Sequence, residues 1–257
     1  MPQLKLSLSN GIFSKYTLDE SIDFVRLLGF ENLEFNMKCV QEEDEESVYT
    51  VKKLIDAHRL NCLTVHAASL HVRNETEIPK AIYYGKVSAD FAQKLLSPVL
   101  VVHSNVSRRL PENLRHKFLE EIFEELTPYA KSLGVKLALE NLSYASSGYG
   151  KNVAELEEIL GVIDDGTMGI TIDFCHAEAT GVTVSLLEKY HSRICNVHMS
   201  DKFHKPFIKP RQELTLVLTQ LHEQGYDGPI TLELDHKTPI GEIAKSKALF
   251  DRLLREF

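Results

Sequence analysis

Acidic and histidine side chains recur at the ends of short apolar runs along this chain. Each of these side chains can bind a metal ion or move a proton. The set comprises Glu34, His66, His103, Glu140, Asp173, His198 and Glu233. Carboxylates that converge in a cleft repel one another unless a cation or a proton lies between them. The pattern therefore predicts a metal site where the runs end.

Four of these residues form the best ligand set for one divalent ion. They are Glu140, Asp173, His198 and Glu233. Three carboxylates and one imidazole suit Mn²⁺, Mg²⁺, Co²⁺ or Zn²⁺, and they leave coordination positions open for a substrate oxygen. The sequence therefore predicts a divalent metal ion as the cofactor.

Eight runs of β-forming residues must position these side chains, and a longer segment separates each run from the next. The runs begin near Leu4, Asn32, Cys62, Val99, Val135, Met168, Ile194 and Pro229. Successive starts are 26 to 37 residues apart, which is the size expected of parallel βα units. The turn after the first run lacks the GxGxxG pattern of a dinucleotide fold. We therefore expect an α/β fold, a single (β/α)8 barrel over residues 1–257, with its site at the carboxyl ends of the strands.

Helix signals occupy several of the intervening segments. Thr17 to Glu20 has the form of a capping box before a helix expected over residues 21–28, and Gly29 follows it as a stop. Further helices are expected over 112–133, 153–163, 211–224 and 240–256.

The net charge, the apolar runs and the cysteine spacing limit the kinds of partner that the chain is expected to bind. The chain has 257 residues and a formal net charge of −8, which argues against a protein built to hold the phosphate backbone of nucleic acids. Its apolar runs are far shorter than the roughly 20 residues that cross a bilayer, and the first ten residues lack a signal-peptide core. The four cysteines show no disulfide-like or CxxC spacing. We expect a cytoplasmic protein that acts on a small molecule, with no nucleic acid or membrane partner; homo-oligomerisation is left open.

Four short motifs carry a resemblance to a known family. Leu139-Glu140-Asn141, Ile172 to His176, Val197 to Asp201 and Leu232-Glu233-Leu234 resemble the xylose-isomerase-like barrel superfamily. The ligand candidates are 33, 25 and 35 residues apart, which is similar to the ketose 3-epimerases. That superfamily unites sugar isomerases and epimerases with apurinic endonucleases of the endonuclease IV type, so the resemblance does not by itself choose a reaction.

The resemblance implies a role for each matching position. Glu140 and Glu233 match the acid and base on the two faces of the substrate carbon, and both also touch the metal. Asp173 and His198 match the remaining ligands. His176 matches a residue that hydrogen-bonds to substrate oxygens. His66 and His103 match two histidines that bind substrate in the isomerases and a second zinc in the endonucleases.

Proton transfer through an enediolate is the reaction that these residues suit best. A divalent cation on the substrate carbonyl and its neighbouring hydroxyl stabilises the enediolate, and two carboxylates move the proton between faces or carbons. We therefore expect an isomerase or epimerase of a sugar, sugar phosphate or sugar acid. The alternatives are a dehydratase or lyase on the same scaffold, an endonuclease IV-like phosphodiesterase acting on abasic DNA, and a non-catalytic binding module.

The segment after the seventh run departs from the family pattern. The endonucleases need an Asp-x-His there for a third metal, and this chain has Lys202 where the aspartate would stand. In place of the glycine-rich loop of the epimerases, this chain has residues 204–211, a segment without glycine that is rich in basic side chains. We expect His204, Lys202 and Arg211 to contact the substrate, with the basic loop recognising a phosphate or carboxylate. Ser146 stands where ketose epimerases use a glutamate, which argues against a plain ketohexose.

Overall fold

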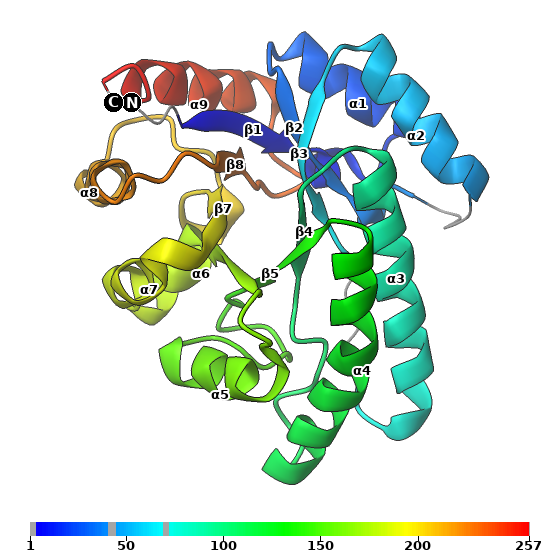
Figure 1. The fold of residues 1–257 in the computed structure, drawn as a ribbon. Helices are drawn as coiled ribbons and strands as arrows, with labels where there is room; N and C mark the ends of the chain where they lie inside the picture. Colours follow the sequence, from blue (N-terminus) through cyan, green and yellow to red (C-terminus); the bar gives the residue numbers. More distant parts are fainter. Residues whose placement is uncertain (1–3, 41–44, 69–71, 257) are drawn as a thin grey trace.

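Eight parallel strands close into a barrel, and the helices lie around its outside (Figure 1). This computed structural model describes residues 4–40, 45–68 and 72–256. The strands are β1 (Lys5–Ser9), β2 (Asn32–Asn36), β3 (Asn61–His66), β4 (Val99–Val102), β5 (Lys136–Glu140), β6 (Gly169–Asp173), β7 (Ile194–Met199) and β8 (Pro229–Leu232). Each strand pairs with the next in the sequence, and β8 pairs with β1. The predicted (β/α)8 barrel is confirmed, and each strand begins within one residue of its expected start.

The five helices expected from the sequence, now α1, α4, α5, α8 and α9, lie close to their expected positions, and the described residues form four more. Together they are α1 (Leu18–Leu27), α2 (Glu45–Ala57), α3 (Ile78–Lys94), α4 (Glu112–Ser132), α5 (Val153–Ile163), α6 (Phe174–Thr180), α7 (Thr183–Tyr190), α8 (Gln212–Glu223) and α9 (Ile240–Leu253). Helix α1 begins three residues before its expected start because Thr17 is the N-cap residue, with its hydroxyl accepting from the Glu20 amide. None of the described helices combines the length and the apolar character needed to cross a membrane.

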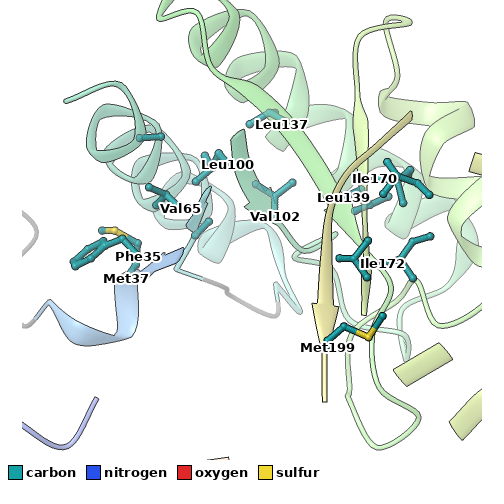
Figure 2. Packing of buried hydrophobic residues seen from close by; sticks show 14 of the residues in the cluster. Phe35, Met37, Val65, Leu100, Val102, Leu137, Leu139, Ile170, Ile172 and Met199 are labelled. Carbon is teal, nitrogen blue, oxygen red and sulfur yellow. The ribbon is translucent and has the colours of Figure 1, made fainter. Parts of the chain in front are cut away.

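Alternation along the strands divides their side chains between two environments. Apolar residues such as Phe35, Leu100, Leu139 and Ile172 are fully buried and pack between the strands and the surrounding helices (Figure 2). This shell between barrel and helices is the hydrophobic core of the protein.

The inside of the barrel carries several buried polar side chains, whereas branched apolar side chains dominate most barrels of this type. Its buried polar residues are Ser7, Glu34, Thr64, Thr171, Asn196 and Thr231. Several are joined by hydrogen bonds, such as the one from Thr231 Oγ1 to Asn196 Oδ1 at 2.9 Å. Polar side chains therefore underlie the carboxyl ends of the strands, where the site lies.

Candidate metal centre

The four residues selected as metal ligands converge at the carboxyl end of the barrel. Glu140, Asp173, His198 and Glu233 each offer one ligand atom, and these four atoms lie within 4.8 Å of one another. His198 Nδ1 is 3.4 Å from Glu140 Oε1, 3.4 Å from Glu233 Oε2 and 3.9 Å from Asp173 Oδ2. Residues that span nearly a hundred positions of the chain therefore surround one point.

The donor set fits a divalent cation. Asp173 Oδ2 is buried and accepts no hydrogen bond from any described residue, which is costly for a carboxylate oxygen unless a cation satisfies it. Glu140 and His198 are almost completely buried, and Glu233 is 17% exposed. The open side of the cluster therefore lies at Glu233, where a substrate oxygen would enter.

Charge explains the pKa values in this cluster. Burial and the nearby charge of Glu233 raise the pKa of Asp173 well above its usual value. Burial opposes the charge on His198, but the neighbouring carboxylates, Glu34 first, outweigh it and raise the His198 pKa well above normal. Burial likewise opposes ionisation of Glu233, yet His198 and other histidines hold its pKa at about 2. Retained protons thus balance the crowded carboxylates, and a bound cation would replace those protons.

Glu34 orients His198 from below. His198 Nε2 is 2.9 Å from Glu34 Oε2, which also accepts from Thr64 Oγ1 at 2.9 Å and from Asn196 Nδ2 at 3.1 Å. Because a carboxylate only accepts, Nε2 must carry the proton, and Nδ1 is left to face the other ligands. The expectation that Glu34 ends its strand is wrong: β2 continues to Asn36, so Glu34 lies one layer deeper. The period-two alternation of residues 32–36 was the signal that could have placed it inside the barrel.

Two further groups of ligand-type side chains adjoin the cluster. His66, His103 and Glu140 form one group, with each histidine Nε2 at 3.2 Å from Glu140 Oε2. Asp173, His176 and His204 form the other. The structure thus joins three groups through two shared carboxylates, those of Glu140 and Asp173.

His204 reaches its group through an unusual turn. Phe203 and His204 both have positive φ angles, 61° and 53°, which are uncommon for residues other than glycine. The turn brings His204 Nε2 to 3.0 Å from His176 Nε2, while His176 Nδ1 lies 3.0 Å from the Asn141 carbonyl oxygen. No local sequence signal indicated this backbone conformation.

The predicted substrate contacts Lys202 and Arg211 do not point into the cluster of ligand-type side chains as His204 does. The Lys202 side chain is exposed, and its backbone amide donates to Asp201 Oδ1 at 2.8 Å. Arg211 forms ion pairs with Glu178 and Asp201, and its guanidinium lies 5.8 Å from the centre of the Phe207 ring. Its charge is therefore already compensated, and the geometry favours a role in holding the loop against α6 over recognition of an anion.

The chain is similar to known proteins both over its whole length and over shorter segments. The chain is 26% identical to an uncharacterized protein of Methanocaldococcus jannaschii, over 98% of this chain and 89% of that protein. A solved D-tagatose 3-epimerase-like protein is 25% identical, with a TM-score of 0.84 over 98% of this chain and 97% of that one. A probable endonuclease 4 of Aquifex aeolicus is 36% identical, but only over 32% of this chain and 28% of that protein.

The family model described as a xylose isomerase-like TIM barrel matches residues 22–253, from within α1 to the end of α9, and so covers seven of the eight strands. The chain therefore belongs to the xylose isomerase-like TIM barrel family.

Proposed function

We propose that this protein is a divalent-metal-dependent isomerase or epimerase of a sugar, sugar phosphate or sugar acid. The observation that carries the proposal is the joint placement of Glu140 and Glu233 around His198 Nδ1, each with an oxygen 3.4 Å from it. Glu140 is the last residue of β5 and Glu233 directly follows β8, and these two strands are not neighbours in the barrel. The two carboxylates can therefore approach a bound substrate from different directions.

Glu140, Asp173, His198 and Glu233 would hold the ion. When bound, the ion would polarise the substrate carbonyl and so acidify the neighbouring C–H bond. One carboxylate then removes that proton, and the other returns a proton to the opposite face or to the adjacent carbon. His66 lies between them, with Nε2 3.2 Å from Glu140 Oε2 and 3.9 Å from Glu233 Oε1, where it can donate to a substrate oxygen.

Proton exchange tests this reaction directly. Metal-loaded protein is incubated in D₂O with a panel of ketoses, ketose phosphates and keto acids, and deuterium incorporation is followed by NMR. We expect exchange in at least one compound, and we expect Glu233→Gln to abolish it while the fold and melting temperature are kept. Glu223→Gln, at the exposed end of α8, is the matched control. Exchange with no member of a broad panel contradicts the proposal, and full activity in Glu233→Gln contradicts the assignment of that residue.

A metal-dependent phosphodiesterase acting on abasic DNA is the second candidate. The observation that favours it is the chain of three ligand groups joined through Glu140 and Asp173, which offers room for more than one ion. The net charge of −8 and Lys202 two residues before His204 favour the first candidate. Metal analysis separates them: one ion per chain without cleavage of abasic DNA supports the isomerase, and two or three zinc ions with cleavage support the nuclease.

A further inference from the structure

A cavity of about 270 Å³ opens beside the metal centre, between the ends of β8, β1 and β2. Glu233 and His204 line it, and both also belong to the ligand groups described above. The cavity is therefore continuous with the metal centre, and a substrate held there would extend into it.

Ser9 supplies an unsatisfied hydroxyl in the wall of this cavity. It is the last residue of β1, is 1% exposed, and its Oγ has no hydrogen-bond partner among the described residues. A buried hydroxyl without a partner is unfavourable, so such groups in proteins usually meet water or a ligand. Ser9 therefore brings to the cavity wall a hydroxyl that has no competing partner among the described residues.

Lys38 supplies a positive charge in the same cavity. Among the described residues that line it, Lys38 is the one side chain with a permanent positive charge, and no described carboxylate lies within ion-pair distance of it. The acidic Asp235 lies in the lining too, with Oδ2 3.8 Å from His236 Nδ1 as its own partner. Among the side chains that the structure describes, the Lys38 ammonium group thus has no fixed counter-ion.

The backbone that carries Lys38 is firmly held. The Lys38 amide donates to Asn36 Oδ1 at 3.0 Å, and the Asn36 amide donates to Asn10 Oδ1 at 2.8 Å. A Cβ atom on Gly11 would lie 2.8 Å from Asn36 Nδ2, so only glycine lets the chain after β1 approach Asn36 this closely. The end of β2 and the short 3-10 helix that follows it (Met37–Cys39) therefore hold the Lys38 backbone in place beside the cavity.

We propose that this cavity binds the end of the substrate remote from the reacting carbon. Ser9 hydrogen-bonds to a substrate oxygen there, and Lys38 binds a terminal anionic group, either a carboxylate or a phosphate. This inference rests on the proposed isomerase or epimerase function and narrows its substrate to an acidic carbohydrate. Lys38, in the 3-10 helix Met37–Cys39 that follows β2, thereby takes the anion-binding role that the sequence suggested for the basic loop of residues 204–211.

Three matched probes test the proposal on the full, metal-loaded chain. D-fructose, D-fructose 6-phosphate and D-fructuronate share their first five carbons and differ only at carbon six, which is neutral, phosphorylated or a carboxylate. Dissociation constants are measured by calorimetry for the wild type, Lys38→Met, Lys38→Arg, Ser9→Ala and Ser7→Ala. Ser7 is the matched control because it lies in the same strand, is buried and unpartnered like Ser9, and does not line the cavity.

We expect at least one anionic probe to bind about tenfold more tightly than fructose, which is the scale of one charge-assisted contact. Lys38→Met should remove this difference, and Lys38→Arg should largely keep it. Ser9→Ala should weaken binding of every probe several-fold, and Ser7→Ala should change none. The stronger of the two anionic probes identifies phosphate or carboxylate as the terminal group.

Equal binding of neutral and anionic probes, undiminished anion binding in Lys38→Met, or no binding of any probe overturns the proposal. Deuterium exchange measured on the same samples shows which of the two proposals has failed, the anion subsite or the isomerase function. Lys38-dependent binding without exchange refutes only the reaction. Exchange that is indifferent to Lys38 refutes only the anion subsite.

Discussion

Replacement of Glu34 by glutamine tests whether the polar layer inside the barrel controls the metal centre. Glu34 Oε2 accepts from His198, Thr64 and Asn196 at 2.9 to 3.1 Å, and both Glu34 and His198 are fully buried. Glutamine keeps the shape of the side chain but removes the charge that strengthens the bond to His198. Loss of such a partner typically weakens metal binding about 10- to 100-fold. That corresponds to about 1.4–2.8 kcal/mol of binding free energy.

The assay is competition with a chelator for Co²⁺, Mn²⁺ or Zn²⁺, on the wild type, Glu34→Gln and the control Glu31→Gln. Glu31 lies just before β2 and is exposed, so its replacement should leave the metal affinity unchanged. The melting temperature of each metal-free variant shows whether the barrel is intact. A metal affinity for Glu34→Gln within about twofold of the wild type would refute the orienting role.

Further outcomes follow from other side chains. Asp173→Asn keeps the N-cap of α6 but removes a carboxyl group whose pKa is raised in the folded protein. A group with a raised pKa costs stability once the pH rises through that pKa, because the folded state must then lose a proton that it holds tightly. At pH 8 the metal-free variant should therefore melt at a higher temperature than the metal-free wild type, and added metal should not raise its melting temperature further. A lower melting temperature, or an undiminished rise with metal, would contradict this. Burial raises the pKa of the Cys39 and Cys62 thiols to about 12, so both should resist iodoacetamide at pH 8 until the protein unfolds, and rapid labelling seen by mass spectrometry would disprove it. Arg211→Met should lower the free energy of unfolding in urea by about 1–3 kcal/mol, since two partly buried carboxylates lose their partner, yet leave binding of the anionic probes unchanged. Weaker binding of the phosphate probe by Arg211→Met would show that Arg211 contributes to substrate binding.

A cluster of carboxylates and histidines also explains why the barrel tolerates a polar interior. Each buried acid near the centre contacts a histidine or a polar neighbour, as Glu140 does with His66 and His103 at 3.2 Å. Burial opposes ionisation of Glu140, but the charge on His198 and these hydrogen bonds hold its pKa well below the usual value. Charge balance within the cluster thus offsets part of the cost of burying these carboxylates.

The sequence by itself determined the barrel and the candidate ligand set that converges in it. Strand and helix signals are local, because they depend on periodicity, caps and breakers within a few residues. Once eight βα units were counted, the carboxyl ends of the strands had to meet at one end of the barrel. Glu140 and Glu233 could therefore be placed together, although 93 residues separate them in the chain.

Only the tertiary structure decided how these side chains are oriented and what adjoins them. Glu34 and His198 are 164 residues apart, and their hydrogen bond depends on the depth of each in the barrel, which a short motif does not encode. The left-handed turn at Phe203 and His204 and the ion pairs of Arg211 separate the roles of residues that share one basic loop. Such roles depend on contacts between distant strands, and contacts of that kind are fixed only when the barrel closes.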